Sequence, residues 1–497
     1  TNSISPSGAF ALKTKITGRY IIGHVDGSPL VFMDGCVIYE EDTIIYVGST
    51  YEEPVDLTID AGNAIISPGF IDLDALCDID HAILDAYPGP ELAKGLEWSE
   101  AYFRGEREEI FTSEEEAFRR RYAFVQLIMN GVTTALPISG EYHKHWAETY
   151  DEFAQMAEIA AELGLRVYMG PSYRSGVMVT QANGEQTVLW DEALGTAGLH
   201  EAVRFVKQYD GKYGGLIKGL LAPARIQTCT TELLQRTRLF ADELDCPVRL
   251  HAAQEDLEIR LLREWYDETP VELLARIGFL APKTLLPHAT HLKGHHPSLP
   301  AGDELPLLSE NGVTVVHCPV IEARYGSVLN SYEKYLHAGV NIGLGTDTFP
   351  PDMIRVMDLA HNLNKIISGN QWSLDAGEIF LAATLNGARA LGREDLGRLS
   401  PGAKADMIVI ELDALRSGVV DDPIRTMILH TSGWNVKTVI INGRTVMLDH
   451  HIPGVDETML RTQAQSYFEK MRQAYSQRDF RQRPVQELFP PVFRYAE

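Results

Sequence analysis

The sequence has few cysteines, and their spacing excludes a disulfide-based fold. There are five among 497 residues, an odd number, scattered along the chain and never in a Cys-x-x-Cys pair. A secreted disulfide framework needs an even set of cysteines at regular spacings. We therefore expect reduced thiols in a cytoplasmic protein.

The sequence also lacks a long apolar run and an excess of positive charge. No stretch reaches the ~18 apolar residues of a membrane-spanning helix, and the first residues show no basic-then-apolar signal pattern. The 44 basic residues against 69 acidic ones give a net charge of −25. This charge argues against nucleic acid or an anionic membrane as a partner, so we expect a small-molecule substrate.

Strand patterns occur at both ends of the chain, and alternating strands and helices lie between them. Residues 43–47 and 438–441 are β-branched and apolar. Between them, helical spacing over residues 113–129, 151–163 and 232–244 alternates with short apolar runs. This alternation favours a (β/α)8 barrel of the TIM type over a bundle or a sandwich.

The expected organisation is a barrel inserted into a small β-sandwich built from both chain ends. The length is sufficient for one large barrel and a companion domain. We place the sandwich at residues 1–66 and 399–455, and the barrel at 67–398. Residues 456–497 are expected to form a C-terminal helix and a tail.

Polar groups follow four successive strand-like runs in the second half of the barrel. The runs end at His251, His288, His317 and Asp347. They lie roughly 30 residues apart, the length of one strand–helix unit. Because the carboxyl ends of parallel barrel strands meet at one rim, these side chains are expected to line a single site.

These strand ends, together with other short motifs, resemble the amidohydrolase superfamily. The motifs include PGFID at residues 68–72, HCP at 317–319, LGTD at 344–347 and GAKAD at 402–406. They run in family order across most of the chain. The most similar branch is that of cytosine deaminase, S-adenosylhomocysteine deaminase and the triazine chlorohydrolases.

The resemblance implies a role for each of the four strand ends. His251 and His288 would bind a metal, and Asp347 would both contact it and take a proton from water. His317 would polarise or protonate the substrate. The cofactor would be one divalent metal per chain, either zinc or iron, manganese or cobalt. The resemblance also implies a homo-oligomer, in this family a homodimer.

The first barrel strand departs from the family pattern. Two metal-binding histidines separated by one residue are replaced here by Asp74 and Leu76. Leucine cannot bind a metal, whereas Asp74 can do so through oxygen. We expect Asp74 to be the fourth ligand; the alternative is a hydrogen-bonding role with no metal contact.

The fifth strand departs as well, and this affects the leaving group. Deaminases of this branch carry a glutamate three residues after the histidine, where this chain has Gln254. An amide cannot act as a general acid or base near neutral pH. Ordinary deamination is therefore disfavoured, and Gln254 is expected to bind substrate. Other substrate-binding candidates, at strand ends or on the segment 87–109, are Trp98, Tyr173, His291 and Glu322.

Together these patterns predict a metal-dependent hydrolase of a small nitrogen-containing or heteroaromatic compound. A metal-bound hydroxide would attack an electrophilic carbon and displace a halide, a thiolate or an activated amide. The alternative is a metal-poor barrel that binds a ligand or catalyses a non-hydrolytic step. The missing pair of histidines on the first strand is its best support.

Overall fold

Parallel strands form a barrel at the centre of the computed structural model, which describes residues 12–79, 89–95, 97–105, 107–138 and 144–496. Within these residues the barrel strands are β6 (Phe70–Leu76), β7 (Val132–Ile138), β8 (Arg166–Met169), β12 (Ile217–Gly219), β14 (Val248–Arg249), β15 (Thr284–Pro287), β16 (Thr314–His317) and β17 (Asn341–Leu344). They pair in two four-stranded sheets. A parallel bridge from Leu221 to Val248 joins the sheets on one side. On the other side, Asp347 N–H donates to Asp74 O at 2.8 Å.

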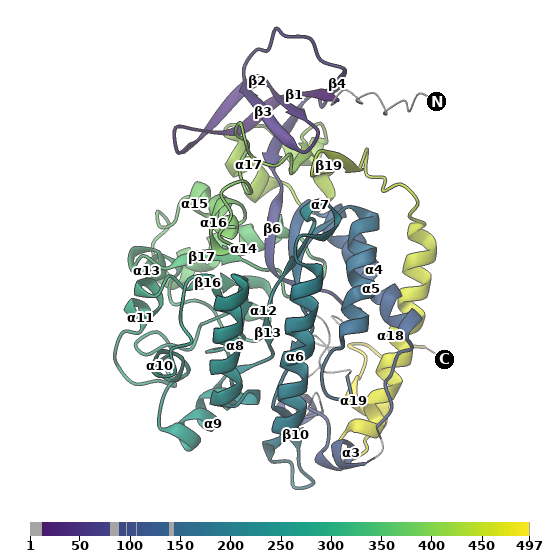
Figure 1. Ribbon diagram of the computed structural model, residues 1–497, viewed down its shortest axis with the longest axis vertical. Coiled ribbons are helices and arrows are strands. Elements are labelled where there is room, and N and C mark those ends of the chain that lie inside the picture. The colour runs from purple at the N-terminus through teal and green to yellow at the C-terminus, as the bar shows by residue number, and fades with distance from the viewer. Residues whose placement is uncertain (1–11, 80–88, 96, 106, 139–143, 497) are drawn as a thin grey trace, which may run out of the picture.

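Helices surround this barrel in the order that the sequence predicted (Figure 1). The larger ones are α4 (Ser113–Met129), α5 (Tyr150–Leu163), α6 (Glu192–Tyr209), α8 (Thr231–Leu244), α9 (Asp256–Tyr266), α10 (Pro270–Arg276), α14 (Met353–Ser368), α15 (Ala376–Ala382) and α17 (Pro423–His430). The helices expected over residues 113–129, 151–163 and 232–244 match α4, α5 and α8 to within one residue at both ends. The barrel prediction is confirmed.

Shorter elements complete the barrel layer and its rim. They are α2 (Pro90–Ala93), α3 (Glu100–Arg104), β9 (Ser172–Tyr173), β10 (Gly176–Thr180), β11 (Gln186–Trp190), α7 (Lys212–Gly215), β13 (Ala222–Pro223), η2 (Ile226–Thr228), α11 (Leu305–Glu310), α12 (Pro319–Arg324), α13 (Tyr332–His337) and α16 (Leu385–Ala390). Several of these lie just beyond the carboxyl end of a barrel strand, so they shape the mouth.

Strands from both chain ends form one eight-stranded sheet, at the top of Figure 1. They are β1 (Lys13–Val25), β2 (Ser28–Glu40), β3 (Thr43–Gly48), β4 (Leu57–Asp60), β5 (Ala64–Pro68), β18 (Met407–Glu411), β19 (Val436–Ile441) and β20 (Arg444–Met447). The ends meet where β5 pairs antiparallel with β18. The two parts of the β-domain expected from sequence, one at each chain end, are therefore joined in one hydrogen-bonded sheet.

Gly69 connects this sheet to the first barrel strand. A Cβ at this position would lie 2.1 Å from the side chain of Thr133 on β7. Only glycine therefore allows β6 to approach β7 this closely. The path of β6, which carries Asp74, depends on this contact.

A buried ion pair fixes the sheet against the barrel. Arg166, at the start of β8, donates to Asp406 through Nε at 2.9 Å and through a terminal nitrogen at 3.1 Å. Asn442 N–H donates to the same carboxylate at 2.7 Å. Both charged side chains are almost fully buried.

The C-terminal helix α18 (Glu457–Arg478) packs beside α4 and α3, and α19 (Val485–Leu488) follows it (Figure 1). Arg478 donates to the Tyr102 hydroxyl at 3.1 Å and lies over the ring of Trp98. The segment around α3 is therefore held by the end of the same chain. Helices η3 (Leu415–Ser417) and η4 (Gly433–Asn435) complete the described elements.

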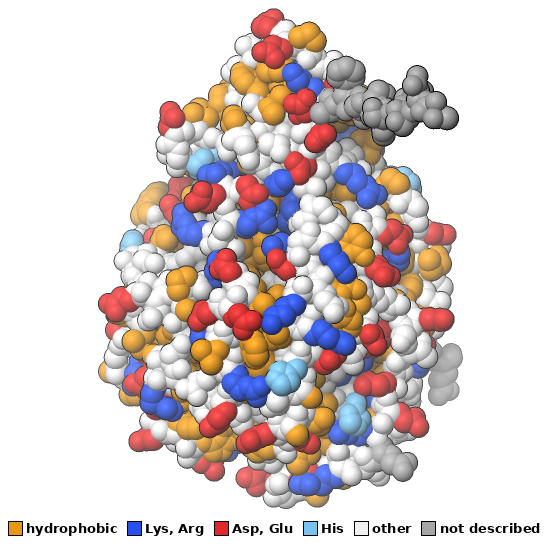
Figure 2. Space-filling view, in the orientation of Figure 1, with side chains coloured by type: hydrophobic (Ala, Val, Ile, Leu, Met, Phe, Trp, Pro, Cys, Tyr) orange, Lys and Arg blue, Asp and Glu red, His pale blue; other side chains and the backbone are white. Residues whose placement is uncertain are grey.

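Acidic and basic side chains are interspersed over the face shown in Figure 2, so the net charge of −25 is not gathered there in one patch. Among the described residues, no helix has the length and apolarity needed to cross a membrane.

Asp406→Ala is expected to lower the free energy of unfolding by about 3–5 kcal/mol, because it leaves the Arg166 guanidinium buried without its counter-charge. Urea unfolding of the purified variant measures this. The matched control is Asp421→Ala, which removes an ion pair with Arg425 in which both side chains are exposed. That change should stay within about 0.5 kcal/mol. Equal losses in both variants would contradict the structural role of the buried pair.

Candidate active site

The four expected metal ligands converge at the carboxyl end of the barrel. His251 Nε2 lies 3.3 Å from Asp74 Oδ2, and His288 Nε2 lies 3.3 Å from Asp347 Oδ2. The rings of His251 and His288 are 5.6 Å apart between centroids. Asp74 extends from β6 and the others follow β14, β15 and β17. The meeting of strand ends at one rim brings them together.

Most of this cluster is buried, and several of its potential metal-binding atoms lack a hydrogen-bond partner. Asp74 is 0% exposed and His288 is 1% exposed. Both ring nitrogens of His288 and Oδ1 of Asp74 have no hydrogen-bond partner among the described residues, although charged groups stand at ion-pair distance. Buried polar atoms are normally paired, and a bound ion is one way to satisfy them. Two imidazoles with two carboxylates form a donor set that fits a divalent transition metal.

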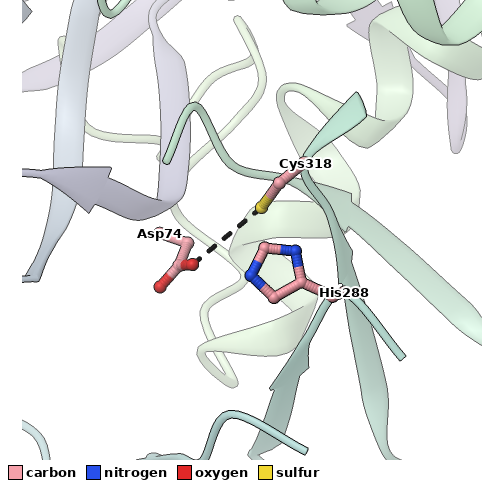
Figure 3. Close-up of side chains that lie close together, drawn as sticks. All are labelled: Asp74, His288 and Cys318. Atoms are coloured by element: carbon pink, nitrogen blue, oxygen red, sulfur yellow. Dashed lines mark hydrogen bonds between the residues drawn. The ribbon is translucent and has the colours of Figure 1, made fainter. Parts of the chain in front are cut away.

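Cys318 belongs to the same cluster, although sequence reasoning did not select it. Its thiol points to Asp74 at 3.9 Å, and the two side chains face His288 (Figure 3). The ligand atoms of these three residues lie within 4.8 Å of one another. Burial, reinforced by the neighbouring carboxylates, raises the pKa of Cys318 well above its usual value. The sulfur is therefore a neutral thiol that donates weakly to Asp74.

Arg249 is a second residue that sequence reasoning missed. Its Nε lies 3.4 Å from Asp74 Oδ1, and its terminal nitrogens donate to the carbonyls of Leu136 and Pro137 at 2.7 and 2.8 Å. Burial raises the pKa of Asp74, but His251 and Arg249 outweigh it and hold the pKa below its usual value. Asp74 is thus an ionised carboxylate shared between Arg249 and His251. The signal was Arg249's position two residues before His251, because alternate residues of a strand face the same side.

Asp72 joins the first and last barrel strands beneath the site. Its carboxylate accepts from Thr346 N–H at 3.0 Å and from the Thr346 hydroxyl at 2.6 Å. It also accepts from Asp74 N–H at 3.2 Å. Burial raises the pKa of Asp72 to about 7. These bonds set the position of Asp347, the next residue after Thr346.

Glu322 lies behind two histidines, which corrects our expectation that it contacts substrate. One oxygen accepts from Cys318 N–H at 3.0 Å and is 3.4 Å from His288 Nδ1. The other is 3.0 Å from His317 Nδ1. Burial raises the pKa of Glu322, but the two imidazoles outweigh it and lower the pKa to about 2. As the fourth residue of α12, Glu322 points back toward the helix start, which directs it at the histidines.

The comparison with protein families settles the classification of this barrel. Residues 65–446 match the model of the Amidohydrolase family, which is more than half of the chain. The chain belongs to the amidohydrolase family. The resemblance inferred from the strand-end motifs is confirmed, and the chain is an enzyme of this superfamily.

Curated relatives and solved structures agree with this classification. The chain is 27% identical over 443 residues to 5'-deoxyadenosine deaminase of Methanosarcina barkeri, covering 88% of this chain and 94% of that one. It is 29% identical over 433 residues to 5-methylthioadenosine/S-adenosylhomocysteine deaminase of Thermococcus sibiricus, covering 85% and 92%.

Two solved structures share the fold. A zinc-bound adenosine deaminase from Xanthomonas campestris has a TM-score of 0.77 at 21% identity, covering 94% of this chain and 100% of that chain. A zinc-bound atrazine chlorohydrolase from Arthrobacter aurescens has a TM-score of 0.71 at 20% identity, covering 92% and 100%. At this identity the structural likeness supports the amidohydrolase fold.

Gln254 lies beside the metal-ligand candidates of this amidohydrolase. It is half-buried, and its side-chain oxygen accepts from Arg225 at 2.6 Å. Its backbone N–H donates to the buried Glu258 at 3.2 Å, as does that of Ala253 at 2.5 Å. Burial raises the pKa of Glu258 to about 8. Gln254 is therefore held at the mouth by its side chain and its backbone.

The remaining substrate-binding candidates separate into one at the rim and two elsewhere. His291 lies at the rim, where its backbone N–H donates to Ala253 O at 2.9 Å. Tyr173 is instead fully buried, and its hydroxyl is 2.9 Å from Thr237 on α8, so it faces the helix layer. Trp98 is 3% exposed and packs against Tyr102 in a separate aromatic cluster. Tyr173 and Trp98 were wrongly placed because the sequence does not show which face of a two-residue strand or an irregular segment is buried.

Asp74→Ala is expected to reduce bound metal, because it removes a buried carboxylate from the donor set and leaves Arg249 facing His251. The measurement is elemental analysis after identical dialysis of wild type, Asp74→Ala and His251→Ala. Both variants should lose metal, and excess metal should partly restore it. If wild type holds metal and only the His251 variant loses it, Asp74 has a structural role.

Proposed function

We propose that this amidohydrolase holds one divalent metal in its central cluster and hydrolyses a small nitrogen heterocycle at an electrophilic ring carbon. The observation that carries the proposal is the cluster of two imidazoles and two carboxylates at the barrel mouth. Buried atoms of His288 and Asp74 in this cluster have no hydrogen-bond partner among the described residues. The names of the relatives support the substrate class, since they are deaminases of adenosine compounds and a chlorohydrolase of atrazine.

The metal would be held by Asp74, His251, His288 and Asp347. When bound, a divalent metal lowers the pKa of its water ligand toward neutrality. Zinc, iron, manganese and cobalt all suit a set of two nitrogen and two oxygen donors. At this central site one ion is favoured over two, because Leu76 offers no ligand atom and the guanidinium of Arg249 stands beside Asp74.

Asp347 is assigned to take the proton from the attacking water. Its side chain is 16% exposed, whereas that of Asp74 is fully buried. Asp347 is therefore the carboxylate with access to the mouth, and its backbone bond to Asp74 fixes its direction. Asp74 is paired with Arg249, so we assign it the role of a metal ligand that takes no part in proton transfer.

His317 is assigned to stabilise the charge that develops on the substrate ring. Its Nδ1 faces Glu322 at 3.0 Å, which leaves Nε2 available to the substrate. A carboxylate behind an imidazole orients the ring. His317 is thus prepared to donate a proton or a hydrogen bond to a ring nitrogen.

Gln254 limits which leaving groups the site can release. Its amide is held by Arg225 and cannot give a proton to a departing amine. A group that leaves as an anion, such as chloride or a thiolate, needs no such proton. An activated amide is the third option. Amino groups on an unactivated ring are therefore disfavoured as leaving groups.

One observation favours a second candidate, a metal-poor barrel that binds a ligand or catalyses a non-hydrolytic step. The ion pair of Arg249 with Asp74 supplies a positive charge inside the site. If wild type, offered zinc, manganese, iron and cobalt in turn, retains none and still turns over substrate, this candidate replaces the metal-dependent one.

His317→Ala is expected to lower kcat by at least ~10²-fold with metal content unchanged, because it removes one positioned acid–base partner but no ligand. Steady-state kinetics with elemental analysis of the same sample measures both quantities. The control is Asp347→Asn, which should abolish turnover and also weaken metal retention. Near-normal kinetics in the His317 variant would remove it from the mechanism.

Gln254→Ala is expected mainly to raise KM, the behaviour of a group that binds ground state and transition state alike. Chloro-, methylthio- and amino-substituted purine ribosides form a probe series that differs only in the leaving group. Wild type should prefer the chloro and methylthio compounds, and Gln254→Glu should gain turnover of the amino compound. A wild-type preference for the amino compound, or loss of kcat at unchanged KM in Gln254→Ala, would contradict the assigned role.

A further inference from the structure

A second group of metal-binding side chains lies at the barrel rim, apart from the central cluster. It consists of Asp256, His291 and His296, whose ligand atoms lie within 4.8 Å of one another. Both histidines are on the segment after β15, and Asp256 is the first residue of α9. We propose that these three residues bind a second divalent transition metal.

The chemistry of the donor set favours such an ion over an alkaline-earth cation. Two imidazoles with one carboxylate suit zinc, cobalt, nickel or iron, whereas magnesium and calcium select oxygen ligands. The carboxylate of Asp256 is 3.9 Å from His291 Nε2, close enough for an ion to bridge them after a small movement. The set carries one negative charge, which partly neutralises a divalent ion.

His291 is the fixed part of the proposed site. It is 5% exposed, and its Nδ1 is 2.9 Å from the Thr290 hydroxyl. Ser327 donates to that hydroxyl at 3.2 Å, so the contact is itself supported. The backbone N–H of His291 donates to Ala253 O. A hydrogen bond at one ring nitrogen orients the other toward a metal, which is the usual arrangement of a ligating histidine.

His296 and Asp256 are the adjustable part. The His296 ring stacks on His291 with centroids 3.6 Å apart, so it must turn to share an ion with it. It is only half-buried, and Ser298 N–H donates to its Nδ1 at a long 3.3 Å, a contact that turning breaks. Asp256 is 72% exposed and free to close over the ion. The rim site should therefore bind more weakly than the central one.

An ion at this position would join two segments of the mouth. Asp256 follows Gln254 by two residues, and His291 already contacts Ala253 through its backbone. The ion would thus hold the segment that carries Gln254 against the segment that follows β15. Its binding does not depend on the proposed function of the central site.

The test is zinc binding to the full chain after metal removal with dipicolinate. Calorimetric titration and elemental analysis should find two ions per chain in wild type. His296→Ala and Asp256→Asn should weaken one of them at least about tenfold and leave the other unchanged. The matched control is His337→Ala, an exposed histidine on α13 outside both clusters, which should keep both ions. His251→Ala should keep the rim ion alone.

Hydrogen exchange gives a second readout that needs no substrate. Zinc should slow amide exchange over residues 289–296 in wild type and in His251→Ala, but not in His296→Ala. Equal zinc stoichiometry and affinity in wild type and His296→Ala would overturn the rim site. If wild type and His296→Ala both bind one ion while His251→Ala binds none, the rim site is excluded and the central metal stands.

Discussion

The closure of the barrel between its first and last strands is the constraint on which the site depends. Asp72 binds the backbone and hydroxyl of Thr346, and Asp347 N–H binds the carbonyl of Asp74. The same few bonds therefore close the barrel and place two carboxylates at its mouth. Because Gly69 lets β6 approach β7 closely, the position of Asp74 is fixed from both sides.

Opposite charges of the site face one another in two groups. Arg249 and His251 face Asp74, while Glu322 faces both His288 and His317. Asp74 and Glu322 thus each have a cationic or ionisable partner, which offsets the cost of burying them. This balance explains how the fully buried Asp74 is accommodated without leaving an isolated charge in the core.

The residues that we expected to depart from the family pattern lie in two parts of the site. The first strand carries Asp74 and Leu76, and Arg249 supplies a positive charge next to Asp74. Gln254, three residues after His251, is held by Arg225. The closing bonds use the backbone of Asp74 and not its side chain, so the side chain at this position can differ without loss of barrel closure.

Much of the fold was accessible from the sequence because it rests on local patterns. The helices over residues 113–129, 151–163 and 232–244 were predicted to within one residue, since apolar spacing and end signals set their bounds. A capping box of Thr112 and Glu115 marks the start of α4. The convergence of His251, His288 and Asp347 followed from their places at strand ends.

Only the tertiary structure decided what each side chain faces. Arg249 was visible as the residue two before His251, but its pairing with Asp74 joins strands far apart in the chain. Glu322 lies behind the histidines because α12 begins at Pro319 and directs its fourth residue backward. Tyr173 faces the helix layer, and Trp98 is covered by Arg478 from the other end of the chain. Sequence periodicity gives the direction of a side chain relative to its own strand or helix, whereas contacts between distant segments depend on how those segments pack.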